Sequence, residues 1–210
     1  MVGQGVLREC LLDPGVQQVL AIGRNGTGQN HAKLRDLVKK DLLDFSDVEA
    51  QLSGCDACFF CLGVASTGMA EEQYTRITHD VPLAAARTLL KQSPGMTFIL
   101  VSGAGADSTE RGRTIWARVK GKTENDLLAM PFKAVFVLRP AAIQPLDGIK
   151  SRTTVYRIVY DLTGPILPFL KRKFPKYITT TRQIGKAMLT LTRSGGSKRV
   201  LENADINEVG

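Results

Sequence analysis

Short apolar segments alternate with longer amphipathic ones along most of this chain, and this alternation constrains its fold more than any other feature. Apolar runs suited to buried strands occur at residues 19–22, 34–39, 55–62, 96–101 and 134–138. Segments suited to helices occur at residues 2–12, 48–52, 71–90, 113–129 and 184–191. Strands that alternate with helices predict a parallel sheet with helices on both faces. The sequence therefore predicts an α/β fold built on a Rossmann-like, doubly wound parallel sheet.

The first elements do not follow the usual order of such a fold. A dinucleotide-binding fold begins with a central strand whose end carries the first glycines, whereas this chain begins with a predicted helix that contains Gly3 and Gly5. Either the first strand is missing, because the chain is truncated or its start is misplaced, or the fold has a gap at its centre. We favour a missing first strand. Gly3 and Gly5 would then end a phosphate-binding turn at a helix N-terminus, although glycines near a terminus are a weak signal.

Size and composition suit one globular domain. The chain has 210 residues, of which 43% are hydrophobic and 23% charged, and these values are ordinary for a folded domain. We therefore expect a single domain over residues 1–210. No apolar run approaches the length of a membrane span, and no secretory signal pattern stands at the start. A cytoplasmic protein is the resulting expectation.

Positive charge is concentrated in the last part of the chain. Residues 1–149 carry 16 basic and 16 acidic side chains, whereas residues 150–210 carry 12 and 4. An anionic partner and a merely solvated basic face both remain open. Residues 150–180 are basic, aromatic and aliphatic, and we predict that they form a lid on the substrate side. A membrane-facing amphipathic helix is the less favoured alternative, because prolines interrupt this segment.

Cysteine and histidine residues give no metal site by their spacing. Cys55, Cys58 and Cys61 form a C-x-x-C-x-x-C pattern that superficially suggests an iron–sulfur cluster. On the predicted strand, however, residues three apart point to opposite faces. We therefore predict buried thiols that pack as small apolar groups. His31 and His79 lack partners at metal-ligand spacing, and we predict surface or capping residues.

Arg24 follows the apolar run at residues 19–22. At the end of the second strand of a nucleotide-binding fold, an acidic residue would bind the ribose of NAD, whereas an arginine suits the 2′-phosphate of NADP. Arg24 therefore predicts NADP (NADPH) as the cofactor and makes NAD the less favoured one. The alternative is a surface arginine in a turn.

Ser102, Trp116 and Lys120 form the candidate catalytic set. Ser102 ends a predicted strand at the carboxyl edge of the sheet, where ligands bind in this fold class, and Lys120 lies on the next predicted helix. A serine, a phenol and a lysine in this arrangement support hydride transfer, since the phenol passes a proton to the carbonyl oxygen. Trp116 stands where that phenol would be, and an indole cannot exchange a proton near neutral pH. A packing role for Trp116 and a solvated Lys120 are the alternatives.

Six segments together resemble a known protein family: VGQGVLRECL, AIGRN, CFFCLGV, SGAGADSTERGR, WARVKGKTE and LRPAAIQP. They are similar to atypical short-chain dehydrogenase/reductases, in particular to bacterial members of the NmrA-like and Tat-interacting oxidoreductase-like group. The resemblance extends over essentially the whole chain. It implies an NAD(P)-binding, epimerase-like Rossmann fold that here lacks its first strand.

The resemblance also implies roles for individual residues. Ser102 and Lys120 match the serine and lysine of the catalytic set, and Trp116 replaces the tyrosine. Gly3 matches the last glycine of the phosphate-binding turn. The cofactor-binding residues that the resemblance implies are Gly3, Arg24, Asp41, Leu62, Gly63, Lys120, Arg139 and Pro140.

Two functions follow from these residues. The first is NADPH-dependent reduction of an unknown carbonyl substrate, for which another group would have to replace the missing tyrosine. The alternative is a regulatory or scaffold protein that binds NADP(H) without turnover. The expected partner is a small-molecule substrate, and the expected state is a monomer or homodimer. No nucleic acid is expected, and a peripheral membrane contact through the basic segment is the least favoured interpretation.

Overall fold

The computed structural model describes residues 1–149 and 176–210. They fall into two compact units. The first unit comprises Met1–Val38, the described part of Pro140–Ser194, and Leu201–Gly210, and the second comprises Lys39–Arg139 and Gly195–Val200. Most of the lid predicted at residues 150–180 lies outside the described residues.

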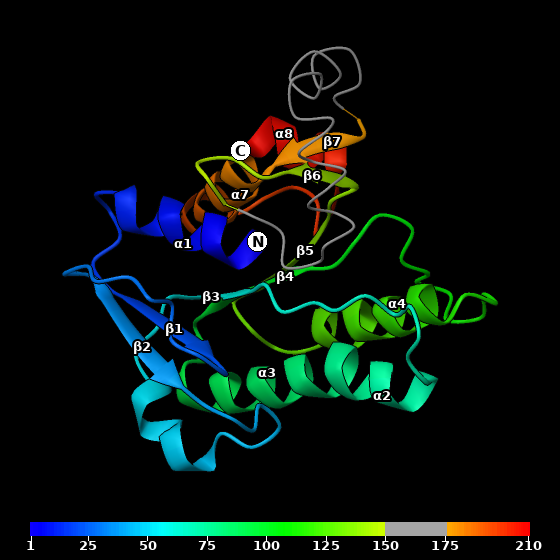
Figure 1. Cartoon of the computed structure of the whole chain (residues 1–210), viewed down its shortest axis with the longest axis horizontal. Helices are drawn as coiled ribbons and strands as arrows, with labels where there is room; N and C mark the ends of the chain where they lie inside the picture. The colour runs from blue at the N-terminus through cyan, green and yellow to red at the C-terminus, as the bar shows by residue number, and fades with distance from the viewer. Residues whose placement is uncertain (150–175) are drawn as a thin grey trace. The chain divides into compact units, whose positions relative to one another are not determined.

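The second unit is built on a sheet with the strand order β3-β4-β5-β8 (Figure 1). Its strands are β3 (Ala57–Phe60), β4 (Thr97–Val101), β5 (Ala134–Arg139) and β8 (Val200–Glu202), which begins in this unit. β4 pairs in parallel with both β3 and β5. The central strands are almost continuously apolar because they are buried on both faces, and Phe98, Ile99 and Val135 have no exposed surface.

Helices of the second unit cover this sheet. η1 (Ser46–Leu52) is a 3-10 helix, and α4 (Ile115–Leu128) follows the long loop after β4. Between β3 and β4, α2 (Glu71–Thr75), the π-helical turn η2 (Arg76–Asp80) and α3 (Val81–Gln92) form one continuous helical run. Figure 1 shows this run beside α4, and both α2 and α3 contact α4. The predicted helix over residues 71–90 is thus present, but with an unpredicted π-turn.

Pro82 helps to explain the irregular turn. Proline has no N–H, so the carbonyl of Thr78, four residues earlier, cannot receive the usual helical hydrogen bond. The hydroxyl of Thr123 on α4 shares its proton between that carbonyl, at 3.1 Å, and the carbonyl of Val119, at 2.7 Å. The neighbouring helix therefore satisfies the group that the proline leaves open, and it fixes Thr78 against α4.

The described residues of the first unit form helices and two parallel strand pairs. These are α1 (Val2–Leu12), the parallel pair β1 (Val19–Gly23) and β2 (Leu34–Val38), the parallel pair β6 (Ala142–Gln144) and β7 (Ile178–Thr180), and the helices α7 (Thr181–Ser194) and α8 (Asn203–Val209). α1 packs directly on α7. A Cβ atom on Gly5 would stand 2.5 Å from the Cβ of Thr181, so Gly5 permits the close approach of these helices.

The parallel pairing of β1–β2, β3–β4, β4–β5 and β6–β7 confirms the predicted α/β class. Some boundaries differ from the prediction. The apolar run at residues 55–62 contains only the four-residue strand β3, and the helix predicted at 184–191 is the longer α7. β6, β7 and β8 were not predicted, since three residues are too few to show a periodic pattern.

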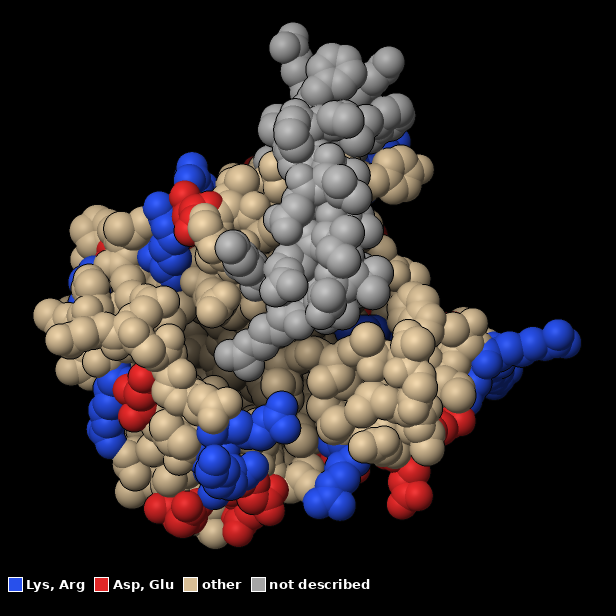
Figure 2. Space-filling model, in the orientation of Figure 1, with Lys and Arg blue, Asp and Glu red and all other residues tan. Residues whose placement is uncertain are grey.

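Charge on the described surface is mixed. On the face that Figure 2 shows, Lys and Arg side chains are interspersed with Asp and Glu side chains. None of the helices in residues 1–149 and 176–210 is long and apolar enough to cross a membrane.

Candidate functional site

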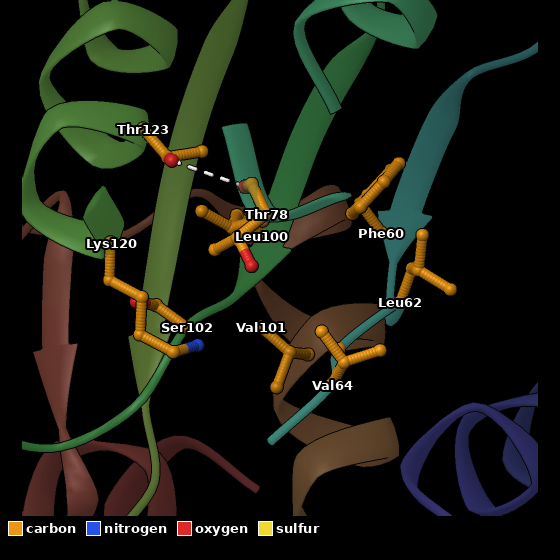
Figure 3. A pocket seen from close by; sticks show the side chains of 10 residues that line it. Phe60, Leu62, Val64, Thr78, Leu100, Val101, Ser102, Lys120 and Thr123 are labelled. Atoms are coloured by element: carbon orange, nitrogen blue, oxygen red, sulfur yellow. Dashed lines mark hydrogen bonds between the residues drawn. The ribbon is translucent and has the colours of Figure 1, made fainter. Parts of the chain in front are cut away.

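A pocket in the second unit lies where β3 and β4 end. It is a small hollow that opens to solvent, with a cavity volume of about 20 Å³. Its apolar wall consists of Phe60, Leu62, Val64, Leu100 and Val101, and its polar groups come from Thr78, Ser102, Lys120 and Thr123 (Figure 3). The carboxyl ends of neighbouring parallel strands are where ligands bind in open α/β sheets. The pocket therefore has the position of a ligand site.

Ser102 directly follows β4 and is held in place by the next strand. Its backbone N–H donates to the carbonyl of Leu138 on β5 at 2.8 Å. Its hydroxyl donates to the carboxylate of Glu124 on α4. The side chain is thus fixed between the sheet and the helix at the pocket wall.

Lys120 reaches the same pocket from α4. In Figure 3 its side chain extends past Ser102, with the nitrogen directed into the pocket. Burial lowers the pKa of Lys120, and the negative charge of Glu124 offsets part of that shift. The structure therefore brings together the predicted serine and lysine at one site.

Trp116 is placed differently from the predicted phenol position. It lies one helical turn before Lys120 but does not line the described pocket. Its ring packs against the loop after β4, where a Cβ atom on Gly105 would stand 3.1 Å from the indole Cη2. The contact seen for Trp116 is therefore a packing contact with that loop.

The remaining predicted residues are divided between the units. In the second unit, Leu62 and Gly63 line the pocket after β3. Asp41 lies in a turn, where its carboxylate accepts the N–H of Leu43 at 2.9 Å. The first unit holds three others: Gly3 is exposed in the first turn of α1, Arg24 is exposed directly after β1, and Pro140 is buried.

Glu124 is the principal residue that the sequence analysis missed. Its side chain is only 1% exposed. Nε of Arg139 donates to its two oxygens at 3.2 and 3.0 Å, and Nη2 of Arg139 also bonds it. Arg139, a predicted cofactor-binding residue, is thus tied to Ser102 through this carboxylate. The signal was available, since a glutamate four residues after Lys120 shares its helix face.

The cysteine and histidine predictions have mixed outcomes. Cys55, Cys58 and Cys61 are free thiols, but they are half-buried rather than buried as predicted. Partial burial raises the pKa of both Cys55 and Cys58. No group of three or more potential metal ligands lies together in the described part of the chain. His31 is an exposed residue whose Nδ1 accepts the N–H of Lys33 at 3.1 Å, as predicted.

His79 is more buried than the prediction of a surface or capping residue implies. Its ring nitrogens lie 2.7 Å from a carboxylate oxygen of Asp80 and 2.7 Å from one of Asp126, and the side chain is only 15% exposed. The ring therefore bridges two carboxylates, one of them on α4. The sequence could not reveal this role, because Asp126 lies 47 residues away.

Solved structures share this fold. An oxidoreductase of the short-chain dehydrogenase/reductase family from Burkholderia thailandensis aligns with a TM-score of 0.70 and 15% identity, over 100% of this chain and 89% of that one. This likeness shows that the chain has a Rossmann-like fold. No protein-family model matches the chain.

Two fungal proteins are similar in sequence. Protein fmp52, mitochondrial, from Emericella nidulans is 27% identical over 150 residues, which are 68% of this chain and 63% of that protein's length. Protein FMP52, mitochondrial, from Saccharomyces cerevisiae is 30% identical over 220 residues, which cover 100% of this chain and 92% of the yeast protein.

The names of these relatives overturn the expectation of a cytoplasmic protein. That expectation rested on the lack of a basic-then-apolar pattern, which describes secretory leaders and carries no information about mitochondria. The yeast alignment extends over nearly the full length of both proteins. On this similarity, the chain belongs to the family of the mitochondrial FMP52 proteins.

Proposed function

We propose that this protein is a mitochondrial oxidoreductase that reduces a small carbonyl compound with NADPH. The observation that carries the proposal is the convergence of Ser102 and Lys120 on one pocket at the carboxyl ends of β3 and β4. The shared fold with an oxidoreductase from B. thailandensis supports it. The mitochondrial names of the relatives support the location.

The pocket residues fit a nicotinamide cofactor. The apolar side chains of Phe60, Leu62 and Val64 offer a surface for a flat ring. Gly63 adds no side chain there, and a Cβ atom at this position would meet nothing within 4 Å. We propose that Lys120 binds a ribose hydroxyl of the cofactor. The cofactor, when bound, supplies the hydride.

Arg24 is the basis for preferring NADPH to NADH. It is exposed directly after the carboxyl end of β1, as the residue that meets a 2′-phosphate would be. A guanidinium binds a phosphate through two parallel, charge-assisted hydrogen bonds. Its hydrogen bond to an uncharged ribose hydroxyl is weaker.

We assign the proton donation to Lys120. The carbonyl oxygen gains negative charge as the hydride arrives and needs a proton. Trp116 does not line the pocket and cannot supply one. Lys120 is directed into the pocket, and burial moves its pKa down, toward the range where an ammonium donates readily.

A second function is favoured by the packing of Trp116 against Gly105. With no phenol in the pocket, the protein would bind NADP(H) as a regulatory or scaffold protein without turnover. In both functions the ligand is a small molecule and the protein a monomer or homodimer. The two differ in whether NADPH is consumed.

NADPH oxidation over a panel of aldehydes and ketones separates them. We expect the wild-type protein to turn over at least one class of carbonyl compound, and Lys120→Met to lose about 10²–10⁴-fold in kcat/KM. Lys122→Met is the matched control, because Lys122 lies two residues along the same helix and is 49% exposed. Cofactor binding without turnover by the wild type would instead support the regulatory function. Equal rates for Lys120→Met and wild type would refute the role of Lys120.

A further inference from the structure

Buried hydrogen bonds dictate the direction in which the Ser102 hydroxyl points. Oε1 of Glu124 accepts this hydroxyl and also Nε of Arg139, whereas Oε2 accepts only from Nε and Nη2 of Arg139 among the described residues. A guanidinium can only donate hydrogen bonds, and a carboxylate paired with it can only accept them. The proton between Ser102 and Glu124 must therefore belong to Ser102.

This arrangement leaves Ser102 with only its lone pairs for a bound ligand. The neighbouring Lys120 has the opposite character, because an ammonium only donates. Ser102 and Lys120 thus give the pocket an acceptor and a donor, in addition to the groups of Thr78 and Thr123. An alcohol oxygen matches both, since it can donate to Ser102 and accept from Lys120 at once, whereas a carbonyl oxygen can only accept.

We infer that Glu124 is a positioning residue that fixes Ser102 as a hydrogen-bond acceptor, so that this pocket binds an alcohol in preference to the corresponding ketone. The inference rests on the proposed function only in taking this pocket as the ligand site. It assigns a role to Glu124, which lies outside the predicted catalytic set. It also states that the pocket binds the alcohol more tightly than the ketone.

Several contacts keep the serine from reversing its hydrogen bond. The backbone of Ser102 is tied to β5 through Leu138 at 2.8 Å. Arg139 is held in turn by the hydroxyl of Ser108, which accepts from its Nη2 at 2.7 Å. If the Ser102 hydroxyl turned toward a ketone, the fully buried Glu124 would lose the hydrogen bond from this hydroxyl. The loss of a hydrogen bond to a buried charged group is costly.

The variant Glu124→Gln should reverse this preference. The guanidinium of Arg139 requires acceptors, so the amide oxygen of the glutamine would face Arg139. The amide nitrogen would then face Ser102 and donate to it. The serine hydroxyl would be released to donate toward the pocket, where a ketone accepts it. Glu72→Gln makes the same chemical change on the exposed surface of α2 and is the control.

Ligand-observed NMR with cyclohexanol and cyclohexanone as probes measures the preference without added cofactor. For wild type and Glu72→Gln we expect the alcohol to bind about 3- to 10-fold more tightly, the range that one hydrogen bond gives. Glu124→Gln should bind the ketone at least as well as the alcohol. Ser102→Ala should show no preference between the two probes. If circular dichroism shows that Glu124→Gln is unfolded, the result for Ser102→Ala decides the test.

Three results would overturn the inference. They are a wild-type protein that favours the ketone or binds neither probe, a folded Glu124→Gln variant that still favours the alcohol, and a Ser102→Ala variant that keeps the wild-type preference. An NADPH titration of the same samples reports separately on the proposed function. Cofactor binding without an alcohol preference would contradict the inference alone, whereas an alcohol preference without cofactor binding would contradict the proposed function alone.

Discussion

At the scale of single residues, burial determines what the pocket can do. Glu124 is buried on α4 yet charged, and its partners Ser102 and Arg139 come from the ends of β4 and β5. Breaking such a buried pair by removing one partner typically costs about 3–5 kcal/mol. Lys120 lies on the same helix face, where burial and the charge of Glu124 act on its pKa in opposite directions.

Lys120 should make stability depend on pH in a defined direction. Burial lowers its pKa in the folded protein below the ordinary value of 10.5. Between these two pKa values the unfolded chain binds the proton more readily, so stability rises with pH. We expect the free energy of unfolding of the wild type, minus that of Lys120→Met, to increase from pH 7 to pH 10.

Urea unfolding of both proteins at four pH values in this range measures the difference. Lys122→Met is the control, because Lys122 is half exposed and its substitution should give a difference that does not rise. A difference for Lys120→Met that stays flat or falls with pH would show that the ammonium is not desolvated in the folded protein.

Part of the site could be predicted at this scale and part could not. Ser102 and Lys120 could be predicted, because the sequence indicates a strand that ends at Ser102 and a helix that carries Lys120. Both residues line one pocket in the structure. Glu124 was missed because a charged residue is normally expected at the surface. Trp116 could be aligned with a tyrosine, but the sequence does not say that its ring packs on the loop at Gly105.

At the scale of elements, the loop after β4 and helix α4 are built to fit closely. Gly121 lies on α4 where the loop passes, and the N–H of Asp107 in that loop donates to the carbonyl of Ala117 at 2.9 Å. The loop also carries Ser108, which contacts Arg139. The fit between loop and helix therefore supports one side of the pocket.

Gly121→Ala should disrupt this fit. The new Cβ atom would stand 1.8 Å from the carbonyl oxygen of Asp107, which is backbone and cannot turn aside. Alanine would otherwise favour the helix by about 1 kcal/mol. We expect the clash to outweigh this gain and to lower the free energy of unfolding by at least about 1–3 kcal/mol.

Gly95→Ala is the control for this substitution, since a Cβ atom at Gly95 would meet nothing within 4 Å. Chemical denaturation of both variants gives the comparison. A Gly121→Ala protein as stable as the wild type would mean that the loop does not rest on α4 as described.

The elements also show which features the sequence could predict. Most of the longer strands and helices follow from apolar runs and helical periodicity, as for β4 and α4, but the seven-residue α8 was not predicted. The π-turn was not predicted, because it depends on Thr123 of another helix completing the bond that Pro82 leaves open. The short strands β6 and β7 depend on each other for pairing and have little local signal.

At the scale of the whole molecule, parallel strands and covering helices give the fold, and the family follows from similarity along the full chain. The sequence analysis could not give the compartment, because it rested on the lack of a long apolar run and of a secretory signal pattern. Neither feature separates a cytoplasmic from a mitochondrial protein. The predicted single domain and the lid at residues 150–180 remain predictions. Both proposed functions require that this molecule bind a nicotinamide cofactor.

Titration of the full chain with NADPH and NADH, followed by nicotinamide fluorescence, tests this requirement most directly. We predict saturable binding that favours NADPH, weaker binding by Lys120→Met, and binding by Lys122→Met that equals the wild type. Saturable binding that favours NADH would contradict the role given to Arg24. A folded protein that binds neither nucleotide would contradict the account as a whole.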